Sequence, residues 1–160
     1  MNIAANDVFS GEQVSAIAKI ESLQEEMLNF PAEVQNMPPV KHYFAPGCYA
    51  REMLIPKDCL IIGKIHKHSH LNTIAYGNVA VATFDGVKQY VGHNTFTSEP
   101  GIKRVVLALE DTLWTTYHPT EETDLEKIED EVIAKSYDDT SFLESMMKYL
   151  QKIKDSGEGL

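Results

Sequence analysis

The middle of this chain is a succession of short β-type segments separated by turn residues. From residue 42 to residue 119, runs of β-branched, aromatic and other apolar residues are interrupted by glycine, proline and aspartate. Such runs are typical of strands, because these side chains pack well on a pleated surface. About eight short strands in a segment of under about 80 residues predict a small closed barrel or jelly roll. The predicted strands lie near residues 49–55, 59–67, 71–76, 78–84, 87–91, 94–98, 102–109 and 112–118.

The clearest turn in this region is Asp85-Gly86, between the strands predicted at 78–84 and 87–91. A two-residue hairpin turn needs positive φ, which glycine and aspartate adopt at low cost. The sequence therefore predicts that these two strands form an antiparallel hairpin.

The residues before the β region predict a helix followed by an extended arm. Ser10 and Gln13 have the spacing of a capping box, and apolar residues then recur at helical intervals, which predicts a helix over residues 11–29. The proline-rich segment 31–39 cannot continue a helix and is expected to be extended.

The residues after the β region predict two further helices. Apolar residues at helical spacing predict one helix over residues 124–135, capped by Thr123, and a second helix that begins at Thr140. The segment from Asp155 to the C-terminus is predicted to be a frayed tail.

The charge of the chain changes at the same places. Residues 1–41 carry six acids and two lysines, residues 42–120 carry six acids and seven bases, and residues 121–160 carry twelve acids and five lysines. We therefore predict an N-terminal helix and arm, a nearly neutral barrel, and acidic C-terminal helices with a tail. A barrel without an excess of positive charge offers no basic stripe for phosphates, which argues against nucleic-acid binding.

Length and composition favour a single cytoplasmic domain. The chain has 160 residues, 43% of them hydrophobic, which is enough for one core. No segment approaches the roughly 18 consecutive apolar residues of a membrane span, and no basic segment leads into an apolar one at the N-terminus. We expect no membrane contact and no export. Cys48 and Cys59 are expected to be free thiols.

Four of the six histidines lie in two β-type segments. Alternate residues of a strand project to one face, so His66, His68 and His70 are predicted to share a face, unless a local bulge turns His68 aside. Neutral imidazole binds transition metals, and with His118 these residues predict a site for one divalent ion such as Zn, Fe, Ni or Mn. The alternatives are a polar outer face of an edge strand, or inward histidines satisfied by hydrogen bonds.

The order of several motifs resembles a single-domain cupin, a double-stranded β-helix. These motifs are Gly63-x2-His66-x-His68, Gly77, Asp85-Gly86, Pro100-Gly101 and Trp114-x3-His118. The resemblance implies a mainly β, cupin-type jelly roll over residues 42–120, with the N-terminal helix and arm and one or two C-terminal helices attached. It also implies dimers, and it places the last strand, with His118, near the strand that carries the first motif.

Residues 42–134 resemble more closely the small cupin-like proteins encoded in bacteriophage genomes. This resemblance implies a viral protein of unassigned activity, located in the host cytoplasm or the virion. It rests on the motifs Tyr49-Ala-Arg51-Glu52, Gly-Lys-Ile-His66-Lys, His70-Leu-Asn72, Pro100-Gly-Ile-Lys-Arg104-Val and Leu-Glu-Asp-Thr-Leu-Trp114-Thr-Thr-Tyr-His118.

The chain departs from the cupin pattern at two ligand positions. A cupin's first motif normally has a glutamate four or five residues after its second histidine, where this chain has Asn72 or Thr73 counted from His68, and apolar residues counted from His70. Near the fourth ligand position it has Arg104, whose guanidinium is always protonated and cannot bind a metal.

The two arginines, Arg51 and Arg104, both lie in predicted strands, whereas the chain has twelve lysines. We expect them to bind an anionic group at the barrel mouth, with Asn72 and Trp114 as further ligand-binding candidates. The alternatives are a structural salt bridge for the arginines and simple packing for Trp114.

Two classes of function fit these features. One is a metal-binding enzyme or sensor with an open coordination position for a small ligand. The other is a non-catalytic virion, assembly or host-interaction protein that uses the jelly roll as a scaffold. In both cases we expect a homodimer or larger homo-oligomer in which residues 11–29 or 31–45 contact a neighbour, because an extended arm reaches roughly 30 Å and exposed sheet edges favour being covered. The alternative is that both terminal segments fold back on their own barrel.

Overall fold

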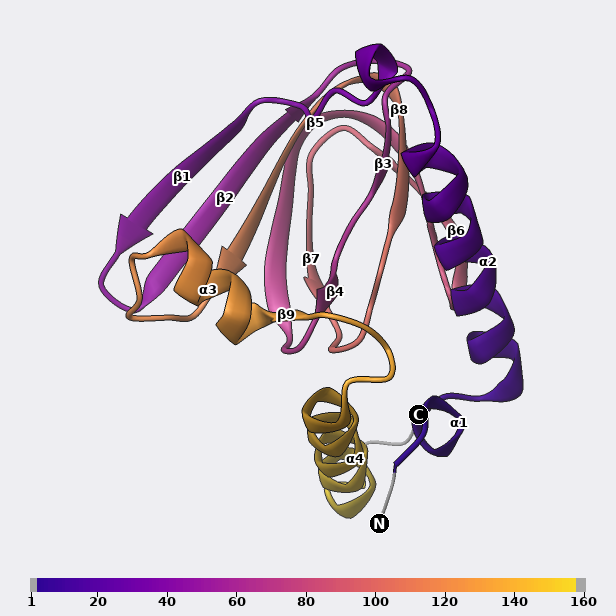
Figure 1. Ribbon diagram of the computed structural model, residues 1–160. Helices are drawn as coiled ribbons and strands as arrows, with labels where there is room; N and C mark the ends of the chain where they lie inside the picture. Colours follow the sequence, from indigo (N-terminus) through magenta and orange to yellow (C-terminus); the bar gives the residue numbers. More distant parts are fainter. Residues whose placement is uncertain (1–2, 158–160) are drawn as a thin grey trace.

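The computed structural model describes residues 3–157 and shows an antiparallel barrel flanked by helices (Figure 1). The strands are β1 (Val40–Ala45), β2 (Cys48–Ile55), β3 (Leu60–Ile62), β4 (Ile65–His66), β5 (His70–Thr83), β6 (Gly86–Val91), β7 (Asn94–Ser98), β8 (Val105–His118) and β9 (Ile133–Ala134). The helices are α1 (Ala5–Val8), α2 (Gly11–Leu28), the 3-10 turn η1 (Ala32–Val34), α3 (Leu125–Val132) and α4 (Thr140–Asp155).

Two long strands, β5 and β8, organise the barrel. The main sheet has the order β1-β2-β8-β5-β6, with β3 paired to β8 and β7 paired to β5, and every pair is antiparallel. Each long strand pairs with two successive neighbours along its length: β8 with β3 and then β2, and β5 with β7 and then β6. The sheet therefore rolls into a jelly roll, which confirms the predicted fold class (Figure 1).

The sequence predicted strand ends near residues 77 and 110, but both strands continue through these positions in the structure. The strands predicted at 71–76 and 78–84 are the single strand β5, and those at 102–109 and 112–118 are largely the single strand β8. The β5–β8 register shifts around Gly77, which has a φ of 124°. A bulge of this kind bends a strand without ending its pairing with the neighbouring strand. The turn-forming residue Gly77 therefore lies at a bend within β5 and not at the end of a strand.

The bulge changes which residues of β5 face the interior. Before it the buried positions are even-numbered, His70, Asn72 and Ile74, and after it they are odd-numbered, Val79 and Val81. Because strand side chains alternate faces, this irregularity keeps the apolar side chains of both halves of β5 directed into the barrel.

Two larger cores and one small cluster hold the fold together. The barrel core consists of Met53, Ile55, Ile74, Val79, Val81, Val106, Ala108 and Trp114. The core between the helices and the barrel end consists of Phe9, Ile17, Ile65, Ala134, Tyr137, Phe142, Leu143 and Met146. The small cluster joins α3 to the barrel mouth and consists of Tyr49, Ile128 and Val132.

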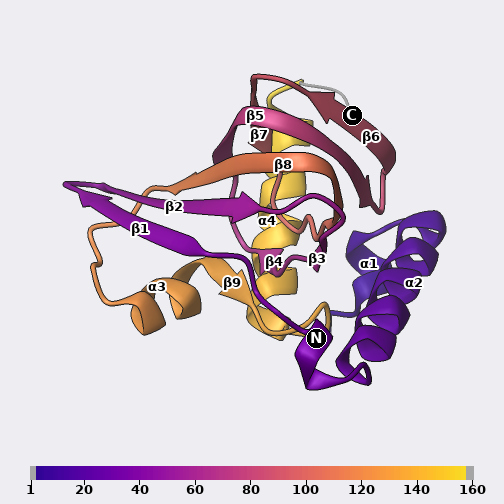
Figure 2. The same ribbon diagram turned by 90° about the horizontal axis from the view of Figure 1, so that it is seen from above.

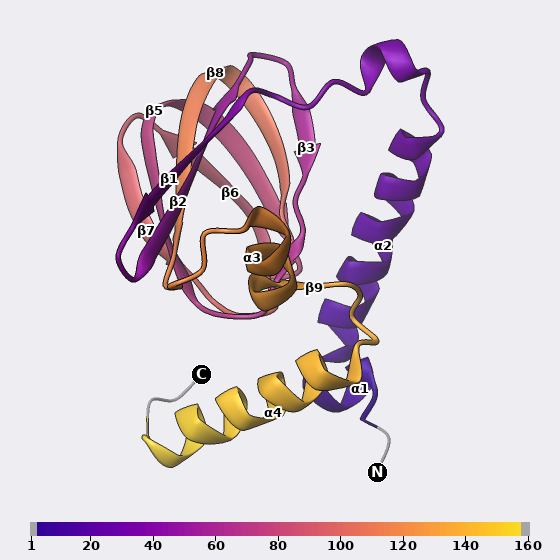
Figure 3. The same cartoon turned by 60° about the vertical axis from the view of Figure 1, so that its left-hand side comes forward.

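The predicted N-terminal helix is confirmed, with Ser10 and Gln13 forming the expected capping box. Figures 2 and 3 show α2 along one side of the barrel and α4 crossing its end. Ile17 and Ile20 are buried against the same chain, so within one chain the helix folds back on its own core. The prediction that residues 31–39 are extended was wrong in part, because residues 32–34 form the 3-10 turn η1. Residues 40–45, at the end of the arm, are extended and form strand β1 on β2.

The C-terminal helices form close to the predicted positions. Their caps are Asp124 and Asp139, one residue away from Thr123 and Thr140, because a carboxylate accepts from the free backbone N–H groups of the first turn. The last residues of the first predicted helix are instead β9, which pairs with β4. Helix α4 continues to Asp155, and residues 158–160 of the predicted tail lie outside the described residues.

Cys48 and Cys59 are free thiols. Among residues 3–157, no helix has the length and hydrophobicity that crossing a bilayer requires.

We expect Gly77→Ala to destabilise the protein by roughly 2–4 kcal/mol. An added Cβ would lie 2.6 Å from Thr112 Cα and would also overlap the Thr112 hydroxyl, which accepts from the Asn78 N–H in the bulge. Gly86→Ala is the matched control, because Gly86 has a similar φ of 117° with open space around it. Denaturant unfolding should show a loss of only about 1–2 kcal/mol for the control, from backbone strain alone. Equal losses in the two variants would show that the close approach to Thr112 is unimportant.

Candidate functional site

Three histidines from different parts of the sequence meet inside the barrel. His66 comes from β4, His70 from the start of β5 and His118 from the end of β8. The ring centroids lie 4.3 Å apart for His66 and His70, 4.8 Å for His70 and His118, and 5.4 Å for His66 and His118. His70 and His118 are only 3% and 5% exposed.

His68 does not join this cluster. The chain leaves the strand after His66 and re-enters one at His70, and His68 lies exposed in the turn between them. Of the two predicted positions for His68, the structure has the one in which it is turned aside, because alternation of side chains holds only within one continuous strand and the chain leaves the strand between His66 and His70.

Hydrogen bonding fixes the proton position on His70. Its Nδ1 lies 3.4 Å from the carbonyl oxygen of His68, and because a carbonyl only accepts, Nδ1 is the nitrogen that carries hydrogen. The lone pair of His70 is then on Nε2, which is buried and has no hydrogen-bond partner. His66 Nδ1 is likewise buried and unpartnered. Two imidazole nitrogens are thus left unsatisfied within the cluster.

The three imidazoles are neutral at physiological pH. Burial lowers the pKa of His66 well below its ordinary value of 6.5, and the neighbouring His70 and His118 add to this shift. Burial also lowers the pKa of His70 to about 4, helped by His118, and the pKa of His118 to about 4, helped by Arg51 and His68. Neutral imidazole is the form that coordinates metals.

Two guanidinium groups lie beside the histidines. Arg51 extends from β2 between the inward-facing Tyr49 and Met53, and Arg104 lies just before β8. Burial lowers the pKa of both arginines. Within residues 3–157 the one ion pair joins Lys64 to Glu129, so the predicted alternative of a structural salt bridge for either arginine is not observed there.

A chain of buried hydrogen bonds positions Arg104. The Trp114 indole N–H donates to Asn72 Oδ1 (3.1 Å), and the Asn72 amide donates to Ser98 Oγ (2.6 Å), which also accepts from Arg104. The guanidinium carbon lies 5.7 Å and 5.9 Å from the centroids of Phe96 and Trp114. Asn72 and Trp114, which the sequence analysis named as ligand-binding candidates, therefore lie beside Arg104. Their side-chain polar groups are already hydrogen-bonded within the chain. Sequence reasoning missed Ser98, whose only signal is its place at the end of a strand.

These residues line two adjoining cavities. The smaller, of about 100 Å³, is lined by both arginines together with His66, Asn72 and Trp114. The larger, of about 370 Å³, is lined by His66, His118 and Arg51 and by apolar residues of β2, β3 and α3. Arg51 and His66 border both cavities, so the two spaces meet at these residues.

The larger cavity also includes an aromatic pair that the sequence analysis missed. The His42 Nδ1 lies 2.7 Å from the Tyr49 hydroxyl. The Tyr49 ring stacks on His118, with centroids 6.0 Å apart. The alternation of Tyr49, Arg51 and Met53 in one strand is the signal that could have placed them on the same inward face.

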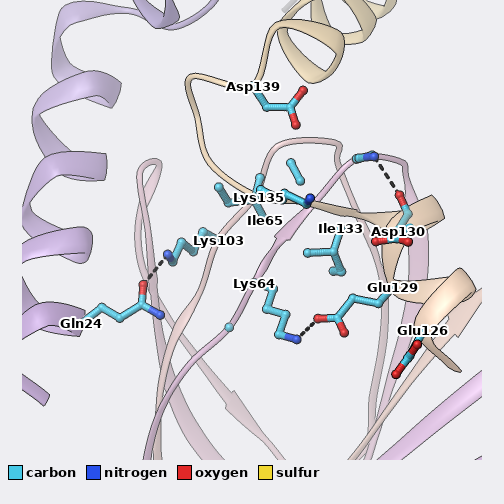
Figure 4. A pocket seen from close by; sticks show the side chains of 13 residues that line it. Gln24, Lys64, Ile65, Lys103, Glu126, Glu129, Asp130, Ile133, Lys135 and Asp139 are labelled. Carbon is cyan, nitrogen blue, oxygen red and sulfur yellow. Dashed lines mark hydrogen bonds and ion pairs between the residues drawn. The ribbon is translucent and has the colours of Figure 1, made fainter. Parts of the chain in front are cut away.

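A third cavity, of about 600 Å³, lies between α2, β4 and α3, and Figure 4 shows its lining. Its lysines are largely satisfied by the chain: Lys64 pairs with Glu129, Lys67 Nζ donates to the Asp130 carbonyl, and Lys103 Nζ donates to Gln24 Oε1 (Figure 4). The Lys64–Glu129 pair also borders the larger histidine cavity and joins α3 to the barrel rim. The positive charges that line this third cavity are therefore largely bonded to other groups of the chain, and the cavity lies where α2, β4 and α3 meet.

The three imidazoles are donors of the type that binds transition metals, and their rings lie about as close together as rings bound to one ion. Metal–nitrogen bonds of about 2.0–2.1 Å place two imidazole rings on one ion roughly 5 Å apart, close to the separations seen here. Among residues 3–157, however, no three His, Cys, Asp or Glu side chains are arranged as they stand to hold an ion. Ring rotation about χ2, a broad torsion in histidine, would be needed to aim the nitrogens at one point.

Comparison with solved structures finds this barrel in several proteins of low sequence identity. A salicylate 1,2-dioxygenase from Pseudoaminobacter salicylatoxidans, in an adduct with gentisate, matches with a TM-score of 0.51 and 11% identity over 77% of this chain and 35% of that chain. Ectoine synthase from P. lautus matches with a TM-score of 0.50 and 11% identity over 67% of this chain and 81% of that chain.

A third match is an RmlC-like cupin family protein with a double-stranded β-helix fold from Methanocaldococcus jannaschii, with a TM-score of 0.46 and 9% identity over 58% of this chain and 88% of that chain. The two matches with TM-scores of 0.50 and 0.51 have the same jelly-roll fold as this chain. No protein-family model matches the sequence, and the search of curated proteins finds no match. At these identities the comparisons establish the fold alone.

We expect metal-free protein to lose stability as the pH falls from about 6.5 to about 4. In this window the unfolded chain binds protons at His70 and His118, whereas the folded chain keeps both neutral. The free energy of unfolding is therefore highest above pH 6.5 and declines toward pH 4, by a few kcal/mol per histidine at most, since one pKa unit corresponds to about 1.4 kcal/mol.

The variant His118→Gln isolates this effect from the carboxylates, which also titrate under acid. Its plot of unfolding free energy against pH, measured with denaturant in the presence of a chelator, should be shallower than that of the native protein by up to about 1.4 kcal/mol per pH unit. His93→Gln, at an exposed position, is the control and should follow the native protein. Parallel curves for His118→Gln and the native protein would contradict the expected burial of a neutral His118.

Proposed function

We propose that this cupin-fold protein binds one divalent transition metal through His66, His70 and His118. The observation that carries the proposal is the pair of buried imidazole nitrogens, His66 Nδ1 and His70 Nε2, that have no partner in a cluster of three rings. A buried polar group left unsatisfied costs about 1–3 kcal/mol, and a shared ion would remove this cost at both nitrogens.

The surroundings of the rings support a metal of the zinc, iron, nickel or manganese type. The His70 Nδ1–H directed at a backbone carbonyl is the arrangement that commonly orients a metal-bound histidine. The cluster has no carboxylate, so its donors are all imidazoles, which favour transition metals over magnesium and calcium. A bound ion would supply Lewis-acid chemistry and an open coordination position toward the larger cavity.

Metal titration of the chelated and then dialysed protein tests this proposal. Calorimetry with Zn²⁺, Ni²⁺, Mn²⁺ and, without oxygen, Fe²⁺ should show one ion per chain for at least one of these metals. The double variant His66→Ala, His118→Ala should bind at least tenfold more weakly and retain its circular dichroism spectrum. His68→Ala is the matched control, because His68 lies in the same motif but outside the cluster.

Three results would contradict the proposal. The native protein would bind none of the metals, the double variant would keep its metal, or His68→Ala would lose it. The first result would favour a non-catalytic assembly or host-interaction role, in line with the resemblance of residues 42–134 to bacteriophage-encoded cupin-like proteins.

We further propose that the chain forms a homodimer or larger homo-oligomer. The chain from the last residue of α2 to β1 exposes four apolar side chains: Leu28 is 66% exposed, Phe30 53%, Val34 64% and Met37 70%. Strand β1 also has a free edge, with Tyr43 and Phe44 exposed. An exposed edge beside apolar side chains favours pairing with a second copy across a two-fold axis.

Light scattering at micromolar concentration should give at least twice the monomer mass. The double variant Phe30→Ser, Met37→Ser should shift the protein toward monomer, because it removes apolar area from the segment that would contact the neighbour. Val87→Ser, which changes an equally exposed residue on the β5–β6 hairpin, is the control and should leave the mass unchanged. A monomeric mass for the native chain would end this proposal.

A further inference from the structure

The two arginines of the barrel interior lack any anionic partner in the chain. Arg104 donates to the neutral Ser98 hydroxyl and lies against two aromatic rings, and Arg51 has neither an ion pair nor a hydrogen bond among residues 3–157. A guanidinium withdrawn from water without a counter-ion is strongly unfavourable. Here two guanidinium groups, each partly shielded from water, border one cavity.

We propose that this cavity binds the carboxylate group of a small organic molecule whose apolar body extends into the larger cavity. The guanidinium fork matches a carboxylate with two parallel hydrogen bonds, which a lysine ammonium does not provide. Both arginines of the chain are placed at this cavity, whereas its lysines are mainly at the surface.

The shape of the site favours an organic carboxylate over a free inorganic anion. The smaller cavity, at about 100 Å³, is large enough for little more than an anionic head group. Its remaining walls are mainly apolar side chains such as Met53, Ile61 and Val106, together with Lys64 and Thr116. The larger cavity continues from it past Arg51 and is closed by Ile128 and Val132 of α3. A ligand with an anionic end and an apolar end fills both spaces.

The hydrogen-bonded chain from Trp114 through Asn72 to Ser98 holds Arg104 ready for this role. Asn72 is fully buried, and Ser98 is 1% exposed, so their hydrogen bonds are protected from water. Ser98 accepts from Arg104 with its oxygen, which leaves other N–H groups of the guanidinium free for a ligand. We regard Ser98 and Asn72 as positioning residues.

The inference deepens the proposed function, because the body of the ligand would lie beside the metal-binding histidines. It can nevertheless be tested without a metal. Calorimetry and thermal unfolding of the native protein in the presence of a chelator would use pentanoate, benzoate, their amides pentanamide and benzamide, and inorganic phosphate. At least one carboxylate should bind at least tenfold more tightly than its uncharged amide and more tightly than phosphate, and should raise the melting temperature.

Variants assign the binding to the arginines. Arg51→Gln and Arg104→Gln should each weaken binding of that carboxylate at least tenfold. Arg104→Lys keeps the charge but loses the fork, and should fall between native and Arg104→Gln. Lys57→Gln, which removes an exposed positive charge outside both cavities, is the control and should bind as the native protein does. Circular dichroism identifies any variant that fails to fold, and the Lys variant keeps the test valid if a Gln variant does.

Four results would overturn the inference: neither carboxylate binds, the amides bind equally well, phosphate binds as tightly as the carboxylates, or the folded arginine variants keep native affinity. Because the titrations contain chelator, they are independent of the metal titration described above. Carboxylate binding without metal binding would refute the metal proposal alone, and metal binding without carboxylate binding would refute this inference alone.

Discussion

The antiparallel pairing of β5 with β8 is the constraint on which the rest of the structure depends. Between them, these two strands pair with β2, β3, β6 and β7, and β1 joins the sheet through β2. The register of this pair shifts at three points between Ile74 and Val79, around the bulge at Gly77, and Thr112 on β8 lies where a side chain at Gly77 would project. Without this irregularity, one half of β5 would direct its apolar side chains to solvent, because a shift of one residue exchanges the faces of a strand. The same bulge therefore permits both a buried apolar end and a buried polar end.

The barrel interior is divided between these two ends. At one end, Val79, Val81, Val106 and Ala108 form an ordinary apolar core. At the other end, neutral histidines and unpaired arginines occupy positions where apolar side chains would stabilise the fold more. Trp114 lies at the boundary: its ring belongs to the core and its N–H begins the hydrogen-bonded chain to Arg104. These polar residues make the fold less stable than an apolar interior would. Such departures from apolar packing are expected at functional sites.

The helices close the barrel and set the limits of its cavities. Helix α3 covers the mouth with Ile128 and Val132, and the ion pair between Lys64 and Glu129 joins it to the rim. Helix α4 packs with α1 and α2 in the second core (Figure 3). The polar end of the barrel is therefore shielded by elements that are distant in sequence, and water removed by this cover strengthens the electrostatic interactions inside.

The sequence by itself determined the mainly β fold, the hairpin at Asp85-Gly86, the helix after Ser10 and the acidic helices, because each depends on local periodicity and turn chemistry. It also drew attention to His66, His70, His118 and both arginines, since their residue types stand out in β-type segments. Only the tertiary structure decided that His68 turns outward, that Gly77 bends a continuous strand, and that Ser98, Tyr49 and His42 lie beside the site. These features depend on where strands exchange partners and on contacts between residues far apart in the chain, and no local pattern contains that information.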